Sequence, residues 1–158
     1  MVALLLRPFF FLLEEENEWW GYVNLSAKEV EGPYEGERNN TGRRRTFTLQ
    51  EERERMSQGW LPFHSHPSSS FPEPSPQDIL ASHLRGGPSY VITTRGIWEI
   101  RPREVLSIEE VQQKNKEAWV EAQELAGADN CDEAFWNWVE LIKKALPVDI
   151  KIIYKGGS

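Results

Sequence analysis

Hydrophobic and polar residues follow one another along this chain in patterns that predict both strands and helices. Segments that combine aromatic and β-branched residues, one of them alternating with polar positions, are typical of strands. They lie at 18–25, 60–66, 90–94, 97–101 and 148–154. A brief further strand is predicted at 47–49. Arg95-Gly96, between two of these segments, predicts a hairpin.

Helices are predicted where apolar residues recur at helical spacing between capping residues. The predicted helices lie at 51–58, 76–84, 107–127 and 131–146. The second begins with Ser75-Pro76 and has Asp78 at its third position, a combination that favours a helix N-terminus. Gly86-Gly87 should end this helix. Strands that alternate with helices in this way indicate the α/β class.

The N-terminal segment is apolar but does not have the pattern of a membrane span. Val2–Leu6 is predicted as a short strand, followed by a short helix over 8–16, with a two-stranded hairpin as the alternative. Arg7 and a proline interrupt the apolar run, which lacks the basic start of a signal peptide and is too short to cross a bilayer. We therefore expect a cytoplasmic protein. Two segments rich in turn residues are predicted loops, at 31–45 and 67–76.

Length and charge narrow the classes of function. With 158 residues the chain has the size of one domain, at about 150 residues per domain, in which 107–158 add C-terminal helices and a final strand. Eighteen basic and 25 acidic side chains give a net charge of −7, which opposes broad binding to nucleic acid or to an anionic membrane. The single cysteine, Cys131, excludes an internal disulfide and a Cys-based zinc site, and we expect it to be a small buried residue.

Two of the three histidines lie two residues apart at the end of a predicted strand. Side chains at positions i and i+2 of a strand lie on one face, so His64 and His66 can reach the same point. Asp78 follows 12 residues after His66, in the first turn of a helix whose dipole favours the ionised carboxylate. Two imidazoles and a carboxylate leave one tetrahedral position on zinc for water, which is typical of catalytic sites. His83, about 140° from Asp78 around the helix, is expected at the surface or in contact with a partner.

These residues resemble the motif of the JAMM metalloproteases, the Mov34/JAB1 family whose catalytic members are called MPN-plus. The family pattern is H-[ST]-H, seven residues and S-x-x-D, with an upstream Glu that is often followed by Gly. This chain has His64-Ser65-His66, Ser75-Pro76-Gln77-Asp78 and Glu18-Trp19-Trp20-Gly21. The resemblance covers about Val2–Arg101. It implies one JAMM-like α/β domain, in which a mixed, curved sheet is sandwiched by helices as in cytidine deaminases.

The loop after the second histidine departs from the family pattern. Eight residues, rather than seven, separate His66 from Ser75, which predicts a bulge of one residue near Phe71. The glycine usual in that loop is replaced by the serines at 68–70. These departures affect the path of the loop more than the ligands, because Asp78 is fixed to its helix.

The resemblance implies Zn²⁺ bound by His64, His66 and Asp78, and hydrolysis of a peptide or isopeptide bond. Glu18 would accept the proton of the attacking water, and the Ser75 hydroxyl would donate to the oxyanion of the tetrahedral intermediate.

Two of these roles have competing explanations. Other glutamates precede Glu18, and Glu16 is the alternative base if the strand begins early. An N-cap would select Ser75 without any catalysis, and the two roles of this serine are compatible.

The same resemblance indicates substrates that are ubiquitin-like or sulfur-carrier proteins ending in Gly-Gly. Alternatives within the fold are a phage-tail or cell-wall endopeptidase, a non-catalytic MPN scaffold, and a RadC-like role near DNA that the net charge opposes. The scaffold class typically lacks the ligands, which this chain has. We expect a protein or peptide partner, with neither nucleic acid nor membrane as a partner. The pattern leaves the substrate, the linkage and the oligomeric state open.

Overall fold

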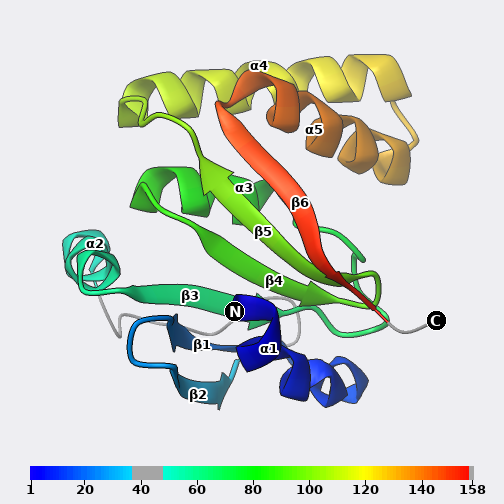
Figure 1. The fold of residues 1–158 in the computed structure, drawn as a ribbon. Helices are drawn as coiled ribbons and strands as arrows, with labels where there is room; N and C mark the ends of the chain where they lie inside the picture. The colour runs from blue at the N-terminus through cyan, green and yellow to red at the C-terminus, as the bar shows by residue number, and fades with distance from the viewer. Residues whose placement is uncertain (37–47, 157–158) are drawn as a thin grey trace.

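A six-stranded mixed sheet forms the centre of the structure, a computed structural model that describes residues 1–36 and 48–156 (Figure 1). The spatial order of the strands is β2-β1-β3-β4-β5-β6. Their bounds are β1 Trp19–Asn24, β2 Glu29–Glu35, β3 Trp60–Ser65, β4 Ser89–Thr93, β5 Gly96–Pro102 and β6 Val148–Lys155. Neighbouring strands are antiparallel except β3 and β4, which are parallel. A parallel pair needs a crossover connection, and the helix between β3 and β4 supplies it.

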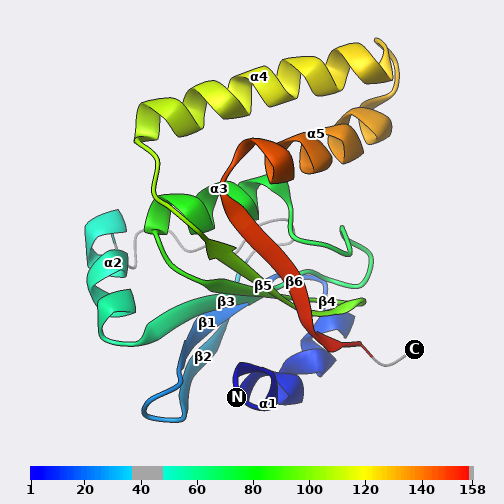
Figure 2. The same cartoon turned by 45° about the horizontal axis from the view of Figure 1, so that its top comes forward.

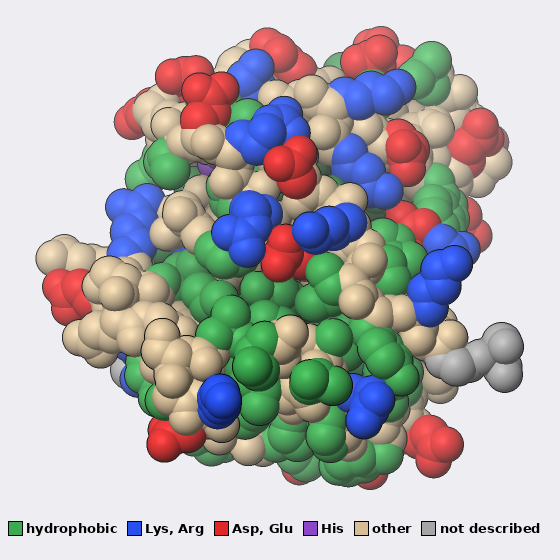
Figure 3. Space-filling view, in the orientation of Figure 1, with side chains coloured by type: hydrophobic (Ala, Val, Ile, Leu, Met, Phe, Trp, Pro, Cys, Tyr) green, Lys and Arg blue, Asp and Glu red, His purple; other side chains and the backbone are tan. Residues whose placement is uncertain are grey.

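Helices cover the two faces of the sheet (Figures 1 and 2). They are α1 Val2–Leu6, α2 Leu49–Ser57, α3 Pro76–Arg85, α4 Ile108–Ala126 and α5 Cys131–Ala145, with a 3₁₀ helix, η1, over Arg7–Glu14. Helices α3, α4 and α5 lie over one face, whereas α1 and η1 lie over the other. Figure 3 shows apolar side chains gathered over the region of α1 and η1, where Leu4 and Phe11 are exposed. No helix in the described ranges is long and apolar enough to cross a membrane.

Each face of the sheet packs into its own hydrophobic core. Alternate residues of a strand point to opposite faces, so Val91 of β4 lies in the core beneath α3, α4 and α5. Its neighbours Tyr90 and Ile92 lie in the core beneath α1 and η1. Every residue of β4 is buried, which places the strand at the centre of the domain. The mixed α/β class predicted from the sequence is confirmed.

Most predicted elements are confirmed, and the errors fall on short segments. Val2–Leu6 is a helix instead of a strand, because a five-residue apolar run carries no periodicity that distinguishes the two. Glu31–Glu35, predicted as loop, belong to β2 and pair with β1. Leu49, predicted to end a strand, begins α2, because Thr48 and Glu51 form a capping box. The rest of the predicted 31–45 loop and of the 47–49 strand lies mostly outside the described residues.

Two single-residue predictions are wrong. Cys131 is exposed at the start of α5 instead of buried. His83, expected at the surface, is completely buried at 0% exposure, and its Nε2 accepts a hydrogen bond of 3.0 Å from the Leu106 backbone N–H. The segment that leads from β5 to α4 covers this side of α3, and the sequence of α3 contains no sign of that covering.

Candidate functional site

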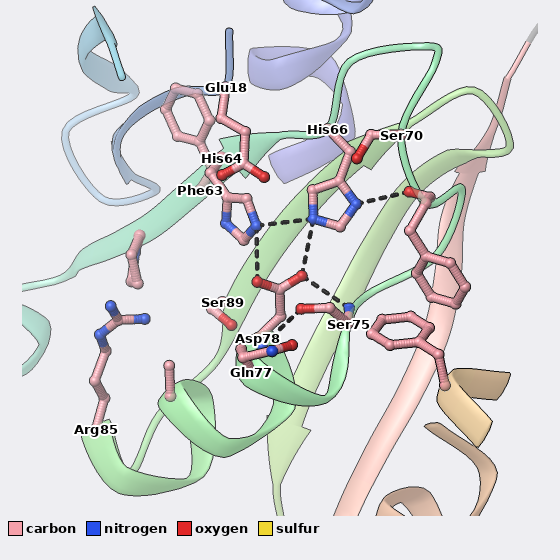
Figure 4. A pocket seen from close by; sticks show the side chains of 14 residues that line it. Glu18, Phe63, His64, His66, Ser70, Ser75, Gln77, Asp78, Arg85 and Ser89 are labelled. Atoms are coloured by element: carbon pink, nitrogen blue, oxygen red, sulfur yellow. Dashed lines mark hydrogen bonds and ion pairs between the residues drawn. The ribbon is translucent and has the colours of Figure 1, made fainter. Parts of the chain in front are cut away.

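A cavity of about 510 Å³ opens where β3 ends and α3 begins (Figure 4). The five residues predicted as a site all line it: Glu18, His64, His66, Ser75 and Asp78. They come from three places that are distant in sequence, namely the approach to β1, the end of β3 and the first turn of α3. The fold therefore brings together the residues that the motif selected.

Two histidines and one aspartate converge at the centre of this cavity. The distance from His64 Nε2 to Asp78 Oδ1 is 3.0 Å, and that from His66 Nε2 to Asp78 Oδ2 is 2.9 Å. The two Nε2 atoms are 3.2 Å apart, and one ligand atom from each residue lies within 4.8 Å of the others. Two imidazole nitrogens and a carboxylate facing one point form a donor set that fits Zn²⁺.

The Phe71 carbonyl orients the second histidine. His66 Nδ1 donates a hydrogen bond of 2.8 Å to this carbonyl oxygen, which directs Nε2 at the cavity as the nitrogen that can bind a metal. The Phe71 ring lies 4.9 Å from the Phe135 ring and 4.7 Å from the Trp136 ring, centroid to centroid. Both partners belong to α5, so this C-terminal helix supports a loop that touches a candidate metal ligand.

A capping box at the start of α3 holds the third ligand. Ser75 Oγ accepts a hydrogen bond of 3.1 Å from the Asp78 N–H, and Asp78 Oδ2 accepts one of 2.9 Å from the Ser75 N–H. The N-cap predicted for Ser75 is confirmed. Because Oγ acts as an acceptor in this box, the hydroxyl hydrogen of Ser75 remains available to a group in the cavity.

Glu18 lies just before β1, and its carboxylate points toward the two histidines in Figure 4. Glu18 is only 8% exposed. The next residue, Trp19, donates its backbone N–H to Ser65 Oγ at 3.1 Å, which holds this segment against the end of β3. Glu16 is exposed and does not line the cavity, because the chain joins the sheet only at Trp19.

Burial and mutual charge shift the pKa values of these groups. Burial raises the pKa of Glu18 above its usual range, although His64 and His66 oppose the shift. Burial alone would raise the pKa of Asp78, but the charges and hydrogen bonds of the same two histidines hold it well below the usual range. Burial lowers the pKa of His66, but the hydrogen bond and charge of Asp78, the Phe71 carbonyl and the Glu18 charge together outweigh burial and raise that pKa to about 9. Metal binding at this site must therefore displace a proton.

Sequence reasoning missed three residues that line or support the cavity. The sequence predicts only a bulge near Phe71, and no motif marks Phe135 in α5. Arg85 lines the cavity as well. Its spacing of seven residues from Asp78, two helical turns, is the local signal in the sequence that places Arg85 on the same helix face.

Comparisons of the chain with protein-family models, with curated proteins and with solved structures gave no match.

Proposed function

We propose that this chain is a zinc-dependent hydrolase of peptide or isopeptide bonds with a JAMM-like site and fold. The convergence of His64, His66 and Asp78 in an open cavity is the observation that carries the proposal. A structural zinc site is usually closed by four protein ligands, whereas three ligands leave a position for water. A buried glutamate and a hydroxyl donor in the same cavity supply the other two groups that amide hydrolysis needs.

The three ligands would hold Zn²⁺ with the Phe71 carbonyl as the partner of His66. When bound, zinc lowers the pKa of a coordinated water to about 7 and polarises a carbonyl oxygen. Asp78 is ionised at neutral pH because its pKa is held low, which suits a ligand.

Glu18 is the proposed general base. Its burial raises the pKa of the carboxyl group, which brings it nearer to neutral pH and improves its match to proton transfer. In this role Glu18 accepts a proton from the attacking water and returns it to the leaving amine. The Ser75 hydroxyl donates to the oxyanion that forms at the carbonyl carbon in between.

The proposed substrate is a ubiquitin-like or sulfur-carrier-like protein with a Gly-Gly tail, which follows from the JAMM resemblance. Glycine has no side chain, so a Gly-Gly segment can approach the bottom of a cavity that a bulkier residue would not enter. We propose a cytoplasmic protein that has neither nucleic acid nor membrane as a partner, in keeping with the net charge of −7.

The test combines metal analysis with cleavage of a panel of Gly-Gly-terminated modifier fusions, with mass spectrometry to locate each cut. Zinc-loaded wild-type protein should contain about one zinc per chain and cut after Gly-Gly. Glu18→Gln should keep the zinc and lose about 100- to 10,000-fold in turnover, the usual contribution of proton transfer. Glu16→Gln is the matched control and should be nearly silent.

The outcomes separate the alternatives. A protein that takes up no zinc after reconstitution contradicts the proposal. If Glu16→Gln loses cleavage and Glu18→Gln keeps it, the general base is Glu16. A protein that binds zinc and cuts no modifier fusion, but cuts cell-wall or phage-tail peptides, belongs to the endopeptidase class. Binding without cleavage in every assay identifies a scaffold.

A further inference from the structure

The cavity extends along α3, away from the histidines, to Arg85 (Figure 4). Asp78, Ala81 and Arg85 follow one another at steps of three and four residues, so they lie on one face of the helix, and all three line the cavity. Seven residues at 1.5 Å per residue place Arg85 about 10 Å from Asp78 along the helix axis. A substrate bound at the metal centre would therefore extend past this arginine.

A buried ion pair sets the orientation of Arg85. Its Nε donates a hydrogen bond of 2.7 Å to Glu52 Oε2, and the Glu52 side chain is 10% exposed. The other carboxylate oxygen, Oε1, accepts a hydrogen bond of 3.4 Å from the Tyr22 hydroxyl. Glu52 thus holds the guanidinium from the side of Nε, where α2 packs beside α3.

The terminal nitrogens of Arg85 have no acceptor among the residues that the structure describes. Within the described part of the chain, the hydrogen bonds of its guanidinium are limited to the one from Nε to Glu52. The Arg85 side chain is nevertheless only 19% exposed. Nη1 and Nη2 form a planar pair of donors that matches the two oxygens of a carboxylate. These donors face the cavity and are held in place through Nε, so they are positioned to bind a ligand that enters it.

Charge favours an anionic ligand group. Among the described residues that line the cavity, Arg85 is the one Lys or Arg. Ser89, whose side chain is buried, lines the same cavity and adds a hydroxyl group. The other ionisable groups of the lining are the candidate metal ligands and Glu18, and all of them already have proposed roles at the metal site.

We infer that Arg85 is a specificity-determining residue that binds a carboxylate of the substrate about three residues from the scissile bond. An extended peptide rises about 3.3 Å per residue, so three residues span the 10 Å between Asp78 and Arg85. The carboxylate belongs to an Asp or Glu side chain or to a free C-terminus. This inference rests on the proposed function, because the hydrolase reaction defines the scissile bond.

The test uses fluorescently labelled peptides with a central Gly-Gly bond. One set carries Glu or Gln at the position three residues before or after that bond. The peptides of the second set end three residues after the bond, either in a free carboxylate or in an amide. Binding to zinc-loaded Glu18→Gln is measured by fluorescence anisotropy, and cleavage by wild-type protein is measured by mass spectrometry. In at least one set, the peptide with the carboxylate should bind about 10- to 100-fold more tightly than its neutral counterpart. This is the gain expected from hydrogen bonds to a charged group.

Substitutions assign this preference to the arginine. Arg85→Met should abolish it, and Arg85→Lys, which keeps the charge without the planar pair of donors, should retain only part of it. Arg101→Met, at an exposed arginine outside the cavity, is the control and should leave the preference unchanged. The double variant Arg85→Met/Glu52→Gln also removes the charge of the buried carboxylate that loses its arginine partner in Arg85→Met.

Equal binding of charged and neutral peptides overturns the inference, as does a carboxylate preference that persists in a folded Arg85→Met variant. Cleavage without any carboxylate preference overturns the role of Arg85 and retains the hydrolase. A carboxylate preference that depends on Arg85, in a protein that cuts no peptide or fusion, retains Arg85 as a binding residue and overturns the proposed hydrolysis.

Discussion

Replacing Ser75 with alanine separates two roles that this side chain combines. Ser75 Oγ accepts the 3.1 Å hydrogen bond from the Asp78 N–H, and its hydroxyl hydrogen is the proposed donor to the oxyanion. The reciprocal 2.9 Å bond runs from the Ser75 backbone N–H to Asp78 Oδ2 and survives the substitution. Asp78 should therefore keep its position, and Ser75→Ala should bind zinc as wild type does.

The two roles predict losses of different size. Removal of an N-cap side chain lowers the free energy of unfolding by about 1 kcal/mol. In a chain of this length, that change lowers Tm by about 2–4 °C. Removal of an oxyanion donor lowers kcat by about 100- to 1000-fold, because the interaction exists only in the transition state. A residue that acts as a cap alone would show the first loss without the second.

Two further variants make the comparison decisive. Ser75→Gly should recover most of the Tm, since glycine is an acceptable N-cap, and should not recover turnover. Thr48→Ala removes a cap of the same 3.1 Å geometry at the start of α2, outside the cavity, and should lower Tm with turnover unchanged. Thermal unfolding, zinc content and kcat on a Gly-Gly fusion are measured for each variant. A Ser75→Ala protein with wild-type kcat would refute the oxyanion role.

The other predictions concern the metal, its support and a buried histidine. Alanine at any one of the three proposed metal ligands should reduce the zinc content from about one per chain to almost none. The far-UV circular dichroism should persist, because the two hydrophobic cores do not need the metal. Loss of that signal when a chelator removes the zinc would contradict a purely catalytic zinc. Phe135→Ala should weaken zinc affinity about 10-fold in a competition titration, because it frees the loop whose Phe71 carbonyl holds His66. Phe11→Ala, at an exposed residue of η1, is the control and should leave zinc affinity unchanged. Burial lowers the pKa of His83 in the folded chain. Below a pH of about 6.5, the His83 side chain therefore takes up a proton more readily in the unfolded chain than in the folded chain. The free energy of unfolding should fall as the pH decreases through this range. Urea unfolding of zinc-loaded protein should show a smaller dependence on pH in His83→Gln, and an equal dependence would disprove this assignment.

The ligand-bearing elements could be predicted because their signals are local. Two histidines at i and i+2 share a strand face wherever the strand lies in the fold. Ser75 and Asp78 belong to a helix start whose hydrogen bonds span only three residues, so four letters of sequence define it. The motif therefore identified the three candidate ligands and the N-cap without any knowledge of the sheet.

Errors arose where local signals were weak or absent. The apolar run at Val2–Leu6 forms α1, of which Val2 and Leu6 are buried, and a run this short is compatible with a helix or a strand. The strand β2 lies at the edge of the sheet, and its charged, proline-containing sequence resembles a loop. The burial of His83 depends on a segment that packs on α3 from 23 residues further along the chain.

The sequence by itself determined the candidate ligands, the capped helix and the α/β class, because each depends on spacing within one element. Tertiary structure alone decided that Glu18 lines the cavity and that Glu16 does not, since the Trp19 contact with Ser65 crosses 46 positions of the chain. It also decided that α5 supports the loop beside His66 and that Arg85 enters the cavity, held by Glu52 of α2. These relations depend on how separate elements pack, and side-chain packing between distant segments leaves no periodic signal in the sequence.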